Sequence, residues 1–181
     1  LTVDGVEPTA ANVLEGTYGV SRPFMMVYKD ENLTDVERAF IDFLASKDGL
    51  EVLESTGTIV DTANAEDFDM SKYDNLTGNM TLGGSTSTEK AVKAAADEFT
   101  ALFPKVTYTY DGTGSGTGVK NAQDGTYTLG FASRELKESE IESGLAYSTL
   151  CMDGIAVVVN KENSTNDITL EQIREVYTGK I

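Results

Sequence analysis

The sequence predicts an α/β fold, a single lobe with a central mixed, mostly parallel sheet flanked by helices. Two observations predict it. Short apolar runs typical of buried strands alternate with segments whose apolar residues recur at helical spacing, and turn residues separate them. The length of 181 residues suits one domain with a real hydrophobic core, and no apolar run approaches the roughly 18 residues of a membrane-spanning helix.

The first 54 residues carry the signals of one strand and three helical segments. Thr9 is a helix start signal, and Gly16 is a stop signal. Thr34 offers an N-cap with Glu37 three residues later, as in a capping box, and Gly49 interrupts the helical pattern that follows. The expected elements are a helix over 9–15, a buried strand over 24–28, and an amphipathic helix pair that starts at residue 34 and resumes over 50–53.

Residues 55–79 are small, polar and acidic with scattered apolar residues, which predicts a connecting segment. Strand and helix signals alternate regularly after it, as expected for a sheet with helices on its faces. The expected elements are a strand near 80–82, a helix over 86–102, a strand over 106–110, a glycine-rich loop with a short helix to 122, a strand over 126–132, a helical turn over 137–141, apolar stretches over 145–152 and 155–160, and a closing helix over 169–177.

The charge balance excludes several classes of partner. Acidic side chains number 30 against 14 basic ones, for a formal net charge of −16. A surface this negative repels phosphate backbones and anionic lipid headgroups, which argues against nucleic-acid binding and electrostatic membrane docking. Residues 1–79 carry −11 of this charge and residues 80–181 carry −5. The negative charge is therefore concentrated in the first part.

The chain has no histidine, which removes the commonest general base and the commonest metal ligand. We expect neither a metal site nor a cofactor. The single cysteine, Cys151, has no partner for an internal disulfide and lies in an apolar stretch. Two interpretations of it stay open: a buried structural thiol, which we favour, and a reactive nucleophile.

Three segments place small polar residues where a predicted strand passes into a helix: 83–88, 112–118 and 132–136. A helix N-terminus presents unpaired backbone N–H groups, and glycine lets the backbone approach a ligand closely. Arg134 adds a charge whose fork geometry suits two oxygens of a phosphate or sulfate. If the strands are parallel, the three segments meet at the carboxyl edge of the sheet and can converge on one small oxyanion.

Each segment also has a purely structural interpretation. The segment 83–88 can be a helix N-cap. The glycine run can be a flexible turn, since it matches neither the phosphate-loop pattern nor the dinucleotide-binding glycine spacing. Arg134 can form a surface ion pair. The coincidence of all three segments favours an anion site.

The same residues resemble a known family. Five motifs carry the resemblance: Gly84-Ser85-Thr86-Ser87, the stretch 112–120, Leu129-Gly130-Phe131-Ala132-Ser133-Arg134-Glu135-Leu136, the stretch 153–160 and the stretch 169–181. In this order they resemble the amino-terminal part of the phosphate-binding protein of bacterial phosphate ABC importers, a solute-binding protein with a type II periplasmic-binding-protein fold. Segments 3–9, 21–23 and 39–44 resemble the carboxy-terminal part of the same family.

The resemblance implies one lobe in circularly permuted order, made of 1–54, the connecting segment 55–79 and 80–181, with the second lobe absent. It implies that phosphate is bound by Ser85, Thr86, Ser87, Gly114, Ser115, Gly116, Ser133 and Arg134. The best-studied branch of the family has an aspartate where this chain has Ser133. The preferred ionisation state of phosphate and the exclusion of sulfate therefore stay open.

The implied function is that of the solute-binding component of an ABC importer, a lipoprotein located outside the cytoplasm that delivers inorganic phosphate to a membrane permease without any chemistry of its own. An isolated lobe is expected to bind phosphate weakly, and apolar area at the missing interface favours self-association. The alternative is an adhesin, sensory or scaffold module without a transport role. An enzyme is a third alternative, with Tyr110, Asp111, Lys120 and Glu135 as candidate acid–base groups.

Overall fold

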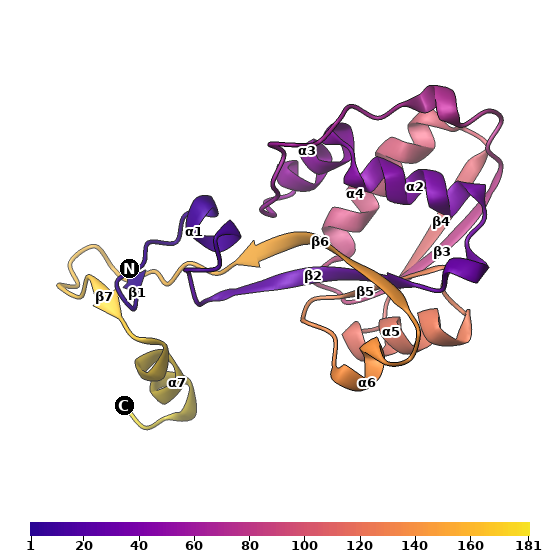
Figure 1. Ribbon diagram of the computed structural model, residues 1–181. Coiled ribbons are helices and arrows are strands. Elements are labelled where there is room, and N and C mark those ends of the chain that lie inside the picture. Colours follow the sequence, from indigo (N-terminus) through magenta and orange to yellow (C-terminus); the bar gives the residue numbers. More distant parts are fainter.

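The computed structural model describes all 181 residues, and a five-stranded mixed sheet is its largest element (Figure 1). The strands are β2 (Ser21–Tyr28), β3 (Gly78–Gly84), β4 (Val106–Gly112), β5 (Leu129–Ala132) and β6 (Ala146–Gly154), in the order β4-β3-β5-β2-β6. β3 runs parallel to β4 and β5, whereas β2 is antiparallel to β5 and β6. The expected mixed α/β sheet is confirmed.

Helices cover both faces of this sheet (Figure 1). On one side lie α2 (Asp35–Ala45), α3 (Lys47–Ser55) and α4 (Glu89–Leu102), and on the other lie α5 (Ser115–Asp124) and α6 (Glu138–Ile141). Side chains of successive residues of β2 pack alternately on the two faces of the sheet. Phe24 and Met26 belong to the larger core, while Met25 and Val27 join a smaller core with Val119 of α5. A strand buried on both faces is apolar throughout, as the run 24–28 is.

The larger core is organised around phenylalanine rings from α2 and α4. Phe40, Phe43 and Phe99 are fully buried, with ring centroids 5.2 Å apart for Phe40 and Phe99 and 5.7 Å for Phe43 and Phe99. The start of α2 is fixed by the expected capping box, in which the Thr34 N–H donates to Glu37 at 3.0 Å. The cap therefore sets where the aromatic face of α2 begins.

The boundary between α2 and α3 lies at Ser46 and not at Gly49, where the sequence pattern placed the interruption. Ser46 is extended, with φ −78° and ψ 164°, and its Oγ accepts a hydrogen bond from the Gly49 N–H at 3.3 Å. Gly49 lies inside α3, where a Cβ would come within 2.0 Å of the Phe43 carbonyl oxygen. Glycine is needed there because the two helices approach closely at their junction.

The segment 55–79 connects α3 to β3 and packs on the core along its way. It contains one short 3₁₀ turn, η2 (Met70–Lys72). The other 3₁₀ turn of the chain, η1 (Asp30–Asn32), lies outside this segment, directly after β2. The Phe68 ring packs edge-on against Phe43 at 5.3 Å between centroids, and Leu76 is buried. The few apolar residues of this acidic segment therefore attach it to the sheet.

The two ends of the chain form a small body of their own, which we call the terminal subdomain (residues 1–20 and 155–181). It contains β1 (Thr2–Val3), α1 (Ala10–Leu14), β7 (Asp167–Ile168) and α7 (Leu170–Thr178), and β1 pairs in parallel with β7. It lies beyond the end of β2 and β6, away from the helices of the large sheet (Figure 1). Of the two apolar stretches in the sequence, 145–152 forms most of β6, whereas 155–160 is irregular.

No helix of the protein combines the length and the apolar character that crossing a membrane requires.

Replacing Gly118 with alanine should lower the free energy of unfolding by about 1–3 kcal/mol, because the new methyl group meets backbone that cannot move aside cheaply. An ideal Cβ at Gly118 lies 2.6 Å from the Gly84 Cα and 2.7 Å from the Phe131 carbonyl oxygen. Urea unfolding measures the change. Gly116→Ala is the matched control on the same helix, with nothing within 4 Å of the added Cβ. Helix propensity makes it neutral or stabilising, and equal losses in both variants would contradict the packing argument.

Candidate functional site

The three strands that precede the polar segments end at one edge of the sheet. β3 pairs with β4 up to Gly84 and Gly112, and β5 pairs with β3 so that Phe131 stands beside Gly84. Because all three strands are parallel, their carboxyl ends point the same way, as the sequence argument required. In open α/β sheets this edge is where ligands bind.

Three serine side chains from the three segments meet at this edge, and we call them the hydroxyl cluster: Ser85, Ser115 and Ser133. The Ser85 Oγ donates to the Ser133 Oγ at 2.9 Å, and the Ser115 and Ser133 Oγ atoms lie 3.4 Å apart. The Ser133 backbone N–H donates to the Ser115 Oγ at 3.1 Å. Residues 48 positions apart in the chain are thereby brought together.

Ser85 is held in place from several directions. It is 3% exposed, and its N–H donates to the Phe131 carbonyl at 2.9 Å. The Tyr110 hydroxyl donates to the Ser85 carbonyl at 2.7 Å, and the Thr88 hydroxyl donates to the same carbonyl at 2.9 Å. Burial raises the pKa of Tyr110 to about 12, which keeps its hydroxyl protonated as a donor. The position of Ser85 is therefore fixed before any ligand binds.

The N-terminus of α5 opens next to the hydroxyl cluster. Its N-cap is Gly114, whose φ of 91° lies in the left-handed region that favours glycine. The Gly114 N–H donates to the Gly84 carbonyl at 2.7 Å, which ties the start of the helix to the end of β3. The N–H groups of Ser115, Gly116 and Thr117 have no acceptor within the helix, and the helix dipole makes this end positive.

Thr86 and Ser87 differ from Ser85 in their surroundings. Both are exposed, on the turn that leads from β3 into α4. The Ser87 N–H donates to the Ser85 Oγ at 3.2 Å, so the turn is folded back on the cluster. The structure thus brings together Ser85, Ser115 and Ser133 with Gly114 and Gly116 beside them, and it places Thr86 and Ser87 at the rim.

Arg134 makes a bidentate ion pair with Glu140. Its two Nη atoms each lie 2.8 Å from one carboxylate oxygen of Glu140, and Nη1 also donates to the Glu135 carbonyl at 2.9 Å. The hydrogen bonds from Arg134, with a further one from the Lys137 N–H, lower the pKa of Glu140 to about 2. Sequence reasoning missed Glu140, for which the only signal was a carboxylate three residues after Lys137 at a helix start.

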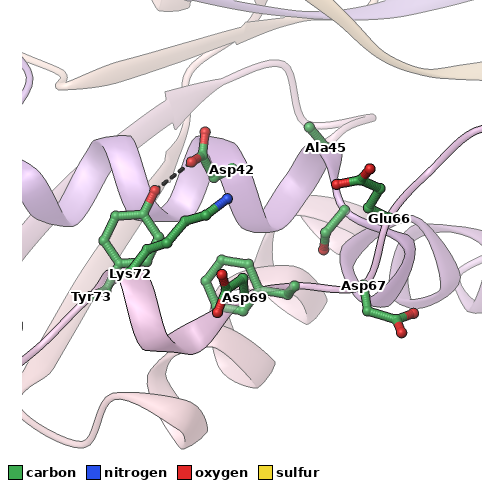
Figure 2. Close-up of a pocket in the computed structure, with 9 residues that line it drawn as sticks. Asp42, Ala45, Glu66, Asp67, Asp69, Lys72 and Tyr73 are labelled. Carbon is green, nitrogen blue, oxygen red and sulfur yellow. Dashed lines mark hydrogen bonds between the residues drawn. The ribbon is translucent and has the colours of Figure 1, made fainter.

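A separate surface pocket of about 160 Å³ lies between α2 and the connecting segment, on the face of the sheet opposite to α5 (Figure 2). The Tyr73 hydroxyl donates to Asp42 at its wall. The lining residues are Asp42, Ala45, Ser46, Glu66, Asp67, Phe68, Asp69, Lys72 and Tyr73. With four carboxylates and one lysine, this pocket repels small anions.

The four residues considered as acid–base groups of an enzyme do not form a catalytic site. The Tyr110 hydroxyl donates to the Ser85 carbonyl, while Asp111, Lys120 and Glu135 are exposed. No hydrogen bond or ion pair joins any two of these four side chains. Cys151 is buried, and burial raises the pKa of its thiol to about 11, so the favoured interpretation of a structural thiol is confirmed.

Comparisons with known proteins place the chain in a family. The sequence profile of a PBP superfamily domain matches residues 62–181. The phosphate-binding protein PstS 2 of Streptococcus agalactiae serotype V is 35% identical over 181 residues, which cover 99% of this chain and 60% of that protein. This chain therefore spans less than two thirds of that relative.

Two solved structures are similar. The crystal structure of a phosphate-binding protein of a phosphate ABC transporter from Streptococcus pneumoniae is 31% identical, with a TM-score of 0.93, and the match covers 100% of this chain and 68% of that one. A putative phosphate ABC transporter substrate-binding protein from Clostridium perfringens, solved with bound phosphate, is 39% identical with a TM-score of 0.51 over 57% of this chain and 43% of that one. The chain therefore belongs to the PstS family of solute-binding proteins, within the PBP superfamily.

Proposed function

We propose that this chain supplies one wall of a cleft that binds inorganic phosphate for an ABC importer. The observation that carries the proposal is the hydroxyl cluster, in which Ser85, Ser115 and Ser133 meet beside the open N-terminus of α5. Hydroxyl groups and helix amides at contact distance are the donors that a small oxyanion requires. The relatives named as phosphate-binding proteins agree with this choice of anion.

The chemistry of the cluster suits phosphate in particular. A serine hydroxyl donates one hydrogen bond and also accepts, so the Ser133 Oγ can accept a hydrogen bond from the P–O–H group of a hydrogen phosphate ion. Sulfate has no proton to donate at neutral pH. The loops 83–87 and 112–118 contain no carboxylate that would repel a dianion. In this cluster phosphate meets neutral donors, with a hydroxyl acceptor in place of the aspartate of the best-studied branch.

Arg134 contributes as a fixed group at the edge of this wall. Both of its Nη atoms bind Glu140, whereas its Nε–H makes no hydrogen bond within the chain. We propose that Arg134 offers its remaining N–H groups to the anion while Glu140 holds the guanidinium in one orientation. Thr86, Ser87, Gly114 and Gly116 complete the proposed set of ligand residues.

The permuted order, with 1–54 preceding 80–181, is the arrangement that we propose for the lobe. The pairing of the strands supports a single lobe made of both parts: β2, from 1–54, lies between β5 and β6, which come from 80–181.

We also propose where the protein acts and to what it passes its ligand. The protein acts as a binding protein and not as an enzyme, outside the cytoplasm, as a lipoprotein held to the membrane by a segment beyond these residues. It passes phosphate to a membrane permease. The alternative is an adhesin, sensory or scaffold module, which is favoured if a two-lobed protein shows no thermal stabilisation by phosphate yet binds a macromolecular partner.

The 181-residue chain should bind phosphate with a dissociation constant above about 1 mM, because it supplies only one wall of the cleft. Titration to 100 mM phosphate, followed by amide NMR shifts, should move the signals of residues 85–87, 114–118 and 133–134 saturably. Equal ionic strength of chloride is the control. Submillimolar affinity by calorimetry would contradict the half-site, and saturable shifts confined to other residues would place the anion elsewhere.

In a two-lobed protein that contains this chain, Arg134→Ala should weaken phosphate binding about 10- to 150-fold, which corresponds to roughly 1.5–3 kcal/mol for charged hydrogen bonds. Calorimetry measures the dissociation constant. The substitution also leaves Glu140 unpaired, so the double variant Arg134→Ala/Glu140→Gln is the matched control. If the double variant regains normal affinity, Arg134 only neutralises Glu140 and does not contact phosphate.

Glu140→Gln should lower the free energy of unfolding by about 1 kcal/mol at neutral pH, since it removes a bidentate ion pair. The pKa of Glu140 is depressed to about 2 in the folded protein, from an ordinary value of 4.5. Its stabilising effect is therefore complete above pH 5 and disappears as the pH falls from 4.5 towards 2. Urea unfolding at a series of pH values measures it, and a difference that grows on acidification would contradict the ion pair.

A further inference from the structure

The three serines of the hydroxyl cluster differ in how far a ligand can reach them. Ser85 is 3% exposed, whereas Ser115 and Ser133 are partly exposed. An anion at the edge of the sheet can therefore meet Ser115 and Ser133 directly, while protein atoms cover the Ser85 hydroxyl. A buried polar group of this kind acts mainly on its partners within the protein.

The hydrogen-bonding capacity of the Ser85 hydroxyl is used inside the cluster. Its O–H donates to the Ser133 Oγ at 2.9 Å, and its Oγ accepts from the Ser87 N–H at 3.2 Å. A serine hydroxyl has a single proton to donate. Because that proton is committed to Ser133, Ser85 has no donor left for an anion.

The hydrogen bond from Ser85 determines what the Ser133 hydroxyl can do. It fills one lone pair of the Ser133 Oγ, so the O–H of Ser133 must point away from Ser85. The contact of 3.4 Å between the Ser133 and Ser115 Oγ atoms is long for an O–H···O hydrogen bond. The Ser133 O–H and its second lone pair therefore stay available to a ligand.

The turn that leads into α4 is divided between groups that hold Ser85 and groups that are free. Thr88 is fully buried, and its hydroxyl lies 2.8 Å from that of Tyr110, the two groups that donate to the Ser85 carbonyl. Thr86 is exposed, and neither its N–H nor its hydroxyl makes a hydrogen bond within the chain. Ser85 thus belongs to the support of the site, and Thr86 to its surface.

We propose that Ser85 is a positioning residue for the anion and not one of its contacts. The buried Ser85 hydroxyl donates to the Ser133 Oγ and thereby fixes the direction in which the Ser133 O–H donates to the anion. This inference rests on the proposed function and assigns different roles to two residues of the same cluster. A donor that is oriented before binding loses less conformational freedom when the anion arrives.

In a two-lobed protein that contains this chain, Ser85→Ala should weaken phosphate binding about 3- to 10-fold, because Ser133 loses the donor that orients it. Calorimetry with inorganic phosphate measures the dissociation constant. In a Ser133→Ala background the same substitution should change the constant less than about twofold, since its effect passes through Ser133. Equal weakening in both backgrounds would mean that Ser85 contacts the anion or only shapes the turn, and would overturn the inference.

Ser46→Ala is the matched control for lost stability. Ser46 is 7% exposed, and its hydroxyl also donates one hydrogen bond, to the Phe43 carbonyl at 2.7 Å, and accepts one, from the Gly49 N–H at 3.3 Å. It lies between α2 and α3, across the sheet from α5. Urea unfolding should show similar losses for Ser46→Ala and Ser85→Ala, while Ser46→Ala keeps normal phosphate affinity. Equal weakening of binding by both substitutions would attribute the effect to stability, and the inference would fail.

The Ser85 hydroxyl proton gives a spectroscopic readout that a merely structural role would not produce. Since this proton is buried and hydrogen-bonded, it should exchange slowly enough to give an NMR signal with a nuclear Overhauser contact to the β protons of Ser133. Saturating phosphate should leave that contact in place. Absence of the signal in the free protein, or loss of the contact on adding phosphate, would overturn the inference.

The calorimetry also separates this inference from the proposed function. If the unsubstituted two-lobed protein does not bind phosphate, the proposed function fails and this inference fails with it. If that protein binds phosphate and the effects of Ser85→Ala and Ser133→Ala simply add, the proposed function stands and only this inference is wrong.

Discussion

The contact between the backbone of α5 and the sheet is the constraint on which the candidate site depends. Glycine stands at three points of this contact, Gly84 in β3, Gly118 in α5 and Gly130 in β5. A Cβ at Gly130 would come within 2.4 Å of the Gly118 carbonyl oxygen, and one at Gly118 within 2.6 Å of the Gly84 Cα. With no side chain between them, helix and strands have a single fixed spacing. That spacing brings the Ser115 Oγ to the end of β5, where the Ser133 N–H donates to it.

The strongly negative charge and an anion site coexist because the charge is placed elsewhere. The acidic pocket lies beside α2 on one face of the sheet, whereas α5 opens on the other side (Figures 1 and 2). Surface charges are screened over about 8 Å at physiological salt. Glu140, in the short helix α6, is paired with Arg134. Long-range repulsion therefore acts on polyanions, while contact donors act on a small ion.

Much of the fold could be predicted because its signals are local. The capping box at Thr34 and the alternation of strands and helices after residue 79 are written in neighbouring residues, and the structure confirms them. Gly49 was misread because a glycine that permits close helix contact looks the same in sequence as one that ends a helix. The stretch 155–160 is as apolar as a strand, yet its backbone bonds to Leu1 and Val20 and not to a strand of the five-stranded sheet. The two-residue strands β1 and β7 carry no pattern at all.

The candidate site likewise has some features that local sequence signals predict and others that depend on the three-dimensional arrangement. The three polar segments were recognisable one by one, and only the parallel directions of β3, β4 and β5 turned them into a single cluster. The pairing of Arg134 with Glu140 depends on the path of the loop between them. Sequence can suggest an ion pair at such a distance, but it does not show that both Nη atoms are occupied. The donors left for a ligand are thus visible only in three dimensions.

The order of strands is compatible with the permuted order that we propose for the lobe. β2 comes from the first part of the chain and lies between β5 and β6, which come from the second. The larger core likewise draws Phe40 and Phe43 from the first part and Phe99 and Phe131 from the second. Sheet pairing and core packing depend on which segments meet and not on which comes first, provided that the join is long enough and polar. The segment 55–79 meets that requirement. Because the two cores beside the five-stranded sheet each draw residues from both parts, the two parts must fold together.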